Sequence, residues 1–158
     1  MTPEALREAM AAHGDAVYRL ALCRLQSTAD AEDVYQDVFL RLFRQDCAGW
    51  DSAHLRAWLL RAAVNRCADV GRFRLRRGTV PLETAAEQAA PEDGAAALWA
   101  AVGRLPVKLR TVVHLHYAEG YSTEEIAAML SIPPATVRTR LHRGREKLKD
   151  ILGGDEDV

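Results

Sequence analysis

The chain has 158 residues, of which 49% are hydrophobic, and its formal net charge is −1. This length allows one ordinary domain or two small ones, and the hydrophobic content excludes wholesale disorder. No apolar run reaches the roughly 20 residues that a membrane-spanning helix needs. The N-terminus lacks a basic segment followed by an apolar stretch, so we expect no signal peptide and a cytoplasmic protein.

The three cysteines are Cys23, Cys47 and Cys67. An odd number at wide spacing fits neither a disulfide framework nor a zinc site. We therefore expect reduced thiols that are at least partly buried, and no metal or other cofactor.

Charge is distributed unevenly along the chain. Of the 21 lysine and arginine residues, six lie between Arg61 and Arg77 and six between Arg138 and Lys149. Each of these segments contains a single acidic residue, whereas acids cluster between Asp30 and Asp37. Two basic stripes in an otherwise acidic chain predict two separate surfaces that face nucleic-acid phosphates.

The first half of the chain predicts three helices. The first begins at Thr2, a capping residue followed by proline, and continues to Leu25 with Gly14 as a possible break. Asp30 is positioned to cap the second helix, whose apolar residues repeat at helical spacing. A loop from Asp46 to Ser52 precedes a third helix from Leu55 to about Arg74. The residues expected to face inward on these two helices include Val34, Val38, Phe39, Leu42, Trp58, Leu59 and Val70.

The second half also consists of helical segments. The first of them stops before Pro106, because a residue that precedes proline avoids the helical conformation. The second ends at Glu119-Gly120, since glycine accepts the left-handed backbone that closes a helix. No segment shows the alternation of a strand. The sequence therefore predicts an all-α protein.

The domain organisation follows from these elements. We expect two small helical bundles, residues 1–77 and 95–152. Residues 78–94, rich in Ala, Glu and Gln, are interpreted as a flexible acidic linker. Residues 153–158 are expected to form a disordered tail.

The stretch from Ser122 to Leu148 predicts a helix-turn-helix. Ser122 and Glu125 have the spacing of a capping box, and Pro134 stands where a second helix begins. At 100° per residue, four positions of that second helix face the core: Val137, Leu141, Gly144 and Leu148. Thr139, His142, Arg143 and Glu146 point the opposite way, flanked by Arg138 and Arg145 on one side and by Arg140 and Lys147 on the other. Such a helix fits the major groove of duplex DNA.

Three segments resemble one known family. Residues 30–42, DAEDVYQDVFLRL, resemble the most characteristic motif of bacterial RNA polymerase sigma factors of the extracytoplasmic-function group. Residues 58–65, WLLRAAVN, resemble that group's second signature, and residues 105–148 resemble its C-terminal domain. The segments occur in the family's order and cover both predicted bundles. Ala135 and Gly144 depart from the pattern, which usually has glycine and alanine there.

The resemblance implies a role for each segment. The acidic helix would dock on the clamp helices of the polymerase beta-prime subunit, and the C-terminal bundle would contact the beta flap. The candidate docking residues are Asp33, Gln36, Asp37 and Arg41. The third helix would engage the opened minus-ten promoter element, with the loop from Asp46 to His54 as a pocket wall. The candidate contacts there are Arg61, Asn65, Arg66, Arg72 and Arg74, with Arg76 and Arg77 as further backbone charges.

The resemblance also implies that the C-terminal helix reads the minus-thirty-five element as a duplex. The candidate residues are Arg138, Thr139, Arg140, His142 and Arg143, most of which the helical wheel selects independently. Trp58 is interpreted as a core residue rather than a stacking platform. Members of the family are often held by an anti-sigma factor, and a long linker would permit such binding here.

An enzyme and a stand-alone transcriptional regulator are the two alternatives to this interpretation. An enzyme is disfavoured because the sequence contains no phosphate loop or nucleophile motif, and because His114 and His116 leave a helix about 200° apart. A stand-alone helix-turn-helix regulator is disfavoured by the acidic helix and by the second basic segment. We therefore expect a transcription initiation factor that is not an enzyme.

Overall fold

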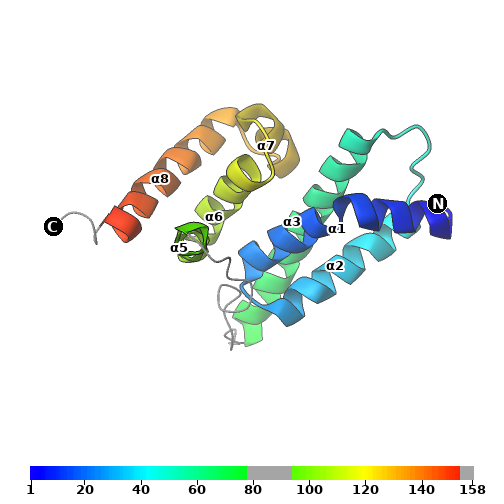
Figure 1. The fold of residues 1–158 in the computed structure, drawn as a ribbon, viewed down its shortest axis with the longest axis horizontal. Helices are drawn as coiled ribbons and strands as arrows, with labels where there is room; N and C mark the ends of the chain where they lie inside the picture. Colours follow the sequence, from blue (N-terminus) through cyan, green and yellow to red (C-terminus); the bar gives the residue numbers. More distant parts are fainter. Residues whose placement is uncertain (78–93, 154–158) are drawn as a thin grey trace. The chain divides into compact units, whose positions relative to one another are not determined.

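The computed structural model describes residues 1–77 and 94–153. Within these two ranges every regular element is helical, so the prediction of an all-α protein is confirmed. The chain divides into two compact units whose boundary lies within residues 78–93 (Figure 1). The predicted linker lies outside the described residues except for Gly94, and the predicted tail does so except for Gly153, which ends the last helix. None of the described helices is long and apolar enough to cross a membrane.

Residues 1–77 of the first unit form a bundle of three helices. They are α1 (Pro3–Leu25), α2 (Thr28–Phe43) and α3 (Ser52–Arg77), and each packs against the other two (Figure 1). Its core is aliphatic, and the largest fully buried side chains include Leu20, Leu42, Leu59 and Leu60. Burial of each such side chain contributes roughly 1.5–3 kcal/mol relative to exposure.

Polar caps set the ends of these helices. Thr2 Oγ1 accepts a hydrogen bond from the backbone N–H of Ala5 at 3.0 Å, as the sequence predicted. The prediction that Asp30 caps α2 is wrong. Ser27 is the cap, and its Oγ accepts from the N–H of Asp30 at 3.2 Å. Asp51 Oδ1 accepts from the N–H of His54 at 2.8 Å, which starts α3 three residues before the predicted beginning.

Gly14 does not break α1, which is one continuous helix of 23 residues. A Cβ atom at this position would lie 2.9 Å from Tyr35 Oη and 3.3 Å from Tyr35 Cε2. The absence of a side chain at Gly14 therefore lets the ring of Tyr35 on α2 approach the backbone of α1.

Within residues 94–153, the second unit contains four α-helices and one π-helical turn. They are α5 (Gly94–Gly103), α6 (Val107–Val113), the π-helical turn η1 (His114–Ala118), α7 (Thr123–Leu130) and α8 (Pro134–Gly153). Helix α8 packs against α5, α6 and α7. Gly120 has φ +80°, so the prediction that a left-handed glycine follows the second helix of this unit is confirmed. The π-helical turn has no counterpart among the predicted elements.

At Gly144, α8 packs closely against α6. A Cβ atom there would lie 2.8 Å from Val113 Cγ2 and 4.0 Å from Leu109 Cβ. Val113 is itself 2% exposed, so it has little room to move. Gly144, which the helical wheel places on the core-facing side, is buried, and its lack of a side chain permits this contact.

All three cysteines are free thiols, as the sequence predicted. Cys67 is buried, and Cys23 and Cys47 are half-buried. Burial raises the pKa of the Cys67 thiol to about 12, so the unreactive protonated form prevails at neutral pH. In the described part of the chain, no three His, Cys, Asp or Glu side chains are placed to hold a metal ion.

Candidate functional site

The polar side of α2 carries the predicted docking residues. Asp33, Gln36 and Arg41 are exposed, and Asp37 is half-buried. The opposite side of the helix is buried, because it supplies Val34, Val38 and Leu42 to the core. The structure thus brings the four candidate docking residues to one accessible side of α2.

One apolar residue on this surface was missed by the sequence prediction. Leu40 is 49% exposed and lies four residues after Gln36, one helical turn further along α2. Its exposure could have been predicted from the sequence, because Leu40 falls outside the buried repeat of Val34, Val38 and Leu42. An exposed leucine beside carboxylates adds an apolar contact to a surface that otherwise offers charge.

Asp37 joins the two predicted sites of the first unit. Its Oδ2 accepts a hydrogen bond from Arg66 Nε on α3 at 2.7 Å. The side chains are 43% and 38% exposed, so solvent reaches both partners of the ion pair. A candidate docking residue and a candidate minus-ten residue are therefore partners in the free protein.

The five candidate minus-ten residues separate into two groups on α3. At 100° per residue, Arg61, Asn65 and Arg72 fall within about 40° of one another. Arg61 and Asn65 are exposed, and Arg72 forms an exposed ion pair with Asp69. We call Arg61, Asn65 and Arg72 the α3 stripe. Arg66 and Arg74 leave the helix about 140° and 220° from Arg61, on the side where α3 meets its neighbours.

Arg74 links all three helices of the first unit. Its Nη1 donates to the carbonyl of Leu25 at 3.0 Å, and its Nη2 forms an ion pair with Asp30 at the start of α2. Its side chain is only 16% exposed, and burial lowers the pKa of the guanidinium from its ordinary value. These contacts assign Arg74 a part in packing, and its contact with DNA stays a prediction.

The loop before α3 lies against an aromatic cluster. The ring centroid of Trp50 is 4.5 Å from that of His54 and 5.8 Å from that of Trp58. The guanidinium of Arg41 lies over the Trp58 ring at 5.9 Å. Trp58 is half-buried rather than fully inside the core, so the inward position expected from the sequence is only partly reached. The cluster connects the predicted pocket wall to the docking side of α2.

The capping box that begins the helix-turn-helix is confirmed. Ser122 Oγ accepts from the N–H of Glu125 at 3.1 Å, and Glu125 Oε1 accepts from the N–H of Ser122 at 2.9 Å. Helix α7 ends at Leu130, and Ser131, which caps it, has φ +57°. After this tight turn, α8 begins at Pro134, where the missing N–H of proline has no helical partner to lose.

The two sides of α8 agree with the helical wheel. Val137, Leu141 and Gly144 are buried, although Leu148 is only half-buried. Four of the five candidate minus-thirty-five residues are exposed, and Arg140 is half-buried. The exposed four are Arg138, Thr139, His142 and Arg143. The prediction of which side of α8 faces solvent is confirmed, whereas contact of these residues with DNA stays a prediction.

Two basic residues at the border of this exposed side interact with neighbouring polar groups. The pKa of the Glu124 carboxyl is lowered by a hydrogen bond from its own backbone N–H, by the Thr123 hydroxyl and, less strongly, by the charge of Arg138. Further along α8, Arg145 Nη1 donates to Tyr117 Oη at 3.1 Å. Arg138 and Arg145 are seven residues apart, so they lie on nearly the same line along the helix.

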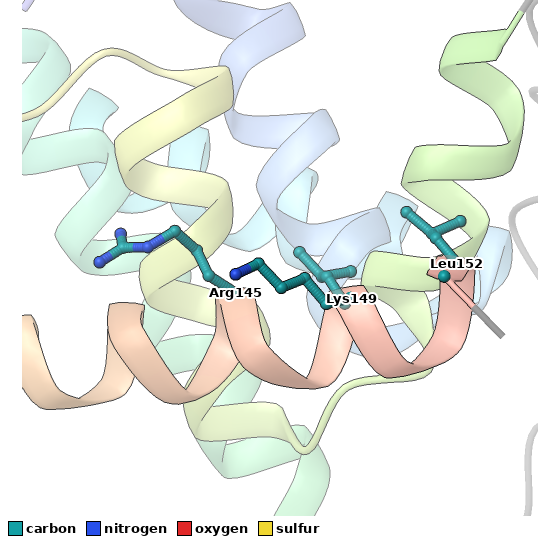
Figure 2. A pocket seen from close by; sticks show the side chains of 5 residues that line it. Arg145, Lys149 and Leu152 are labelled. Carbon is teal, nitrogen blue, oxygen red and sulfur yellow. The ribbon is translucent and has the colours of Figure 1, made fainter. Parts of the chain in front are cut away.

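A groove of about 460 Å³ follows the C-terminal half of α8. Figure 2 shows the side chains of Arg145, Lys149 and Leu152 leaving the same side of the helix. Leu148 and Gly153 complete the lining. The basic border that begins at Arg138 thus continues beyond the predicted reading residues.

The two histidines that bear on the enzyme alternative have separate partners. His114 Nε2 lies 2.8 Å from Glu119 Oε2, and His116 Nδ1 lies 2.7 Å from the carbonyl of Tyr121. Each histidine is therefore part of the connection between α6 and α7.

Both units match known protein families. Residues 9–79 match sigma-70 region 2, and residues 95–148 match sigma-70 region 4. The chain is 35% identical over 148 residues to the extracytoplasmic-function (ECF) RNA polymerase sigma factor SigM of Mycobacterium tuberculosis, covering 89% of this chain and 74% of that protein. It is 38% identical over 154 residues to the ECF sigma factor SigE of Mycolicibacterium smegmatis. That alignment covers 89% of this chain but only 58% of the relative, so the chain spans little more than half the length of SigE.

Solved structures with the same fold support this assignment. CnrH in complex with the cytosolic domain of CnrY aligns with a TM-score of 0.72 and 28% identity, covering 98% of this chain and 91% of that one. The sigma factor RpoE of Bartonella quintana, bound to the anti-sigma factor NepR, shares the fold with a TM-score of 0.81 at 22% identity, covering 95% and 98%. The chain belongs to the sigma-70 family of RNA polymerase sigma factors. Within that family it is a member of the extracytoplasmic-function group.

Proposed function

We propose that this protein binds core RNA polymerase through α2 and directs the enzyme to promoters that carry a minus-ten and a minus-thirty-five element. The observation that carries the proposal is α8, where Val137, Leu141 and Gly144 are buried while Arg138, Thr139, His142 and Arg143 are exposed. A solvated basic helix needs no such arrangement of a hydroxyl, an imidazole and guanidinium groups on one side. A helix that reads base edges in the major groove does.

Docking on polymerase uses the polar side of α2. The carboxylates of Asp33 and Asp37 complement a basic partner surface, and the exposed Leu40 supplies an apolar contact. An interface of this kind combines electrostatic steering with local desolvation. The beta-prime clamp helices are the partner that the family membership favours.

Engagement of the minus-ten element uses the α3 stripe. Arg61 and Arg72 supply positive charge along a nucleic-acid backbone, and the Asn65 amide is able both to donate and to accept hydrogen bonds at a base edge. A base inside a duplex does not expose its pairing edge, so this contact requires an opened strand. Trp50 of the aromatic cluster lies in the loop that precedes the same helix, and its ring packs against Trp58 of that helix.

Recognition of the minus-thirty-five element uses α8 on closed duplex. Arg143 and His142 lie near the middle of the exposed side, where side chains reach base edges. Arg138 and Arg145 lie at its border, where they contact phosphates and fix the register of the helix. The chain itself performs no bond-making chemistry in this account, because nucleotide addition belongs to the polymerase, and it acts in the cytoplasm.

A regulating protein partner is part of the proposal. The structures of CnrH and of RpoE were both determined with a second protein, which for RpoE is an anti-sigma factor. Their fold is shared by this chain. We therefore expect an inhibitory protein to compete with polymerase for the docking side of α2 or for α8.

Reconstitution with core polymerase tests this function against a stand-alone regulator. The protein should form a stable complex with core enzyme, and the complex should bind promoter DNA at least tenfold more tightly than the protein alone. A variant with Asp33→Lys and Gln36→Lys should lose core binding while retaining its helical content. Tight, specific binding to duplex promoter without core enzyme, together with no promoter-directed transcripts in its presence, would establish the stand-alone regulator instead.

A further inference from the structure

The connection between α6 and α7 contains a π-helical turn, η1. The N–H of Glu119 donates to the carbonyl of His114, five residues earlier, at 3.2 Å. Such turns are rare and occur frequently at functional sites. In this unit the turn carries Tyr117, whose large aromatic side chain is 53% exposed.

Buried polar contacts hold this turn in place. The side chains of His114 and Glu119 are 5% and 0% exposed, and their Nε2 and Oε2 atoms lie 2.8 Å apart. The ring of His116 packs edge-on against the ring of Tyr117, with centroids 4.8 Å apart. Because a buried polar pair is costly to break, the backbone that presents Tyr117 is well fixed.

Tyr117 meets the border of the exposed side of α8. Its hydroxyl oxygen accepts a hydrogen bond from Arg145 Nη1 at 3.1 Å. Arg145 lies on the basic border that runs from Arg138 to Lys149, and Figure 2 shows it extending from the same side of α8 as Lys149. A hydroxyl that accepts from a guanidinium keeps its own proton available for a further acceptor.

We propose that Tyr117 is a DNA-backbone contact, which forms with Arg145 a two-donor clamp for one phosphate beside the minus-thirty-five element. The phenol proton and a second N–H of the guanidinium converge on the phosphate oxygens, while the Arg145–Tyr117 bond aligns the two donors. Tyr117 adds affinity without sequence information, because a phosphate contact does not report the base. This inference rests on the proposed function of α8.

The substitution Tyr117→Phe removes the hydroxyl and keeps the ring. In complex with core polymerase, this variant should bind promoter DNA about 3–10-fold more weakly, as expected for the net contribution of one lost hydrogen bond at a solvated surface. The loss should be the same for promoters with intact and with altered minus-thirty-five elements. Tyr18→Phe, the same change on α1, serves as the control and should leave affinity unchanged.

Repeating the substitution in an Arg145→Met protein distinguishes a direct contact of Tyr117 with the phosphate from a role of Tyr117 in positioning Arg145. In an Arg145→Met protein, Tyr117→Phe should still weaken binding, because the phenol retains its own contact with the phosphate. No further loss in that background would overturn the proposal, as would a Tyr117→Phe complex with unchanged affinity. If the unmodified complex itself shows no minus-thirty-five preference, the proposed function of α8 fails and the inference fails with it.

Discussion

The two units hold their basic residues in different ways. In the first unit, Arg66, Arg72 and Arg74 each form an ion pair with a carboxylate. In the second unit, Arg138, Arg140 and Arg143 on α8 form no salt bridge with any described residue. Lys149 of α8 pairs with Glu146, but these three arginines of α8 have no ion-pair partner within the described residues, whereas three arginines of α3 are engaged within the protein.

This difference matches the order of events that we propose. A duplex minus-thirty-five element is accessible before any strand opens, so a helix whose Arg138, Arg140 and Arg143 have no ion-pair partner within the described residues suits it. A minus-ten element becomes readable only after the duplex opens, which happens on polymerase. The Asp37–Arg66 pair connects those steps, because docking that engages Asp37 leaves Arg66 available for DNA.

The largest effect is expected on the exposed side of α8. Replacing Arg143 by alanine should cost about 1–3 kcal/mol of promoter affinity, or roughly 5–150-fold, if its guanidinium reads a base. Competition binding of the polymerase complex with intact and altered minus-thirty-five duplexes measures it. Lys108→Ala removes a charge on α6 and is the control. An unchanged minus-thirty-five preference in the Arg143→Ala protein would show that the reading residues are wrongly assigned.

A smaller effect is expected where α8 meets α6. Gly144→Ala places a methyl group 2.8 Å from Val113 Cγ2. Overpacking costs about 1–3 kcal/mol and the gain in helix propensity returns about 1 kcal/mol, so the second unit should lose up to about 2 kcal/mol of unfolding free energy. Hydrogen exchange resolved by unit measures the loss. The penalty should shrink in a Val113→Ala background, and stabilisation by Gly144→Ala alone would refute the close contact.

A still smaller effect is expected for the pair between α2 and α3. Both side chains are more than a third exposed, so the Asp37–Arg66 interaction should contribute less than about 1 kcal/mol to unfolding free energy. Since Arg66→Gln leaves Asp37 available, it should tighten core polymerase binding by about twofold. Titration of labelled protein into core enzyme measures this change. Weaker binding of the Arg66→Gln protein would mean that polymerase uses the pair intact.

The smallest effect concerns the pH dependence of the first unit. Burial, and secondly the charge of Arg56, lower the pKa of His13 below its ordinary value of 6.5. The unfolded chain therefore takes up a proton first as the pH falls. The contribution of neutral His13 to the free energy of unfolding is therefore fully present above pH 6.5. It decreases as the pH falls toward the folded-state pKa and is constant below that pKa. Urea unfolding between pH 5 and 8 should show this slope, and His13→Gln should remove it. A slope of the opposite sign would contradict the shift.

Local patterns allowed much of the second unit to be predicted. The capping box at Ser122 and the buried repeat of Val137 and Leu141 depend only on residues within one or two helical turns, and both are confirmed. The π-helical turn was not predicted, since its bond from Glu119 to His114 is part of a buried pair that depends on tertiary packing.

The first unit contains contacts between distant residues that local sequence patterns do not predict. Glycine in a helix was interpreted as a possible break, but at Gly14 the decisive contact is with Tyr35, 21 positions along the chain. The partners in the Asp37–Arg66 and Asp30–Arg74 pairs are 29 and 44 positions apart. Charge counting identified Arg66 and Arg74 as basic residues of α3, and only the packing of three helices showed which carboxylates they meet.

The central claim is that this chain directs core polymerase to promoters with two separate elements. The most direct test is transcription in vitro from fragmented genomic DNA of the source organism, with purified core enzyme and mapping of every start site. We predict a defined set of starts that share two upstream sequence elements and that Asp33→Lys/Gln36→Lys protein does not produce. Starts identical to those of core enzyme alone would contradict the account.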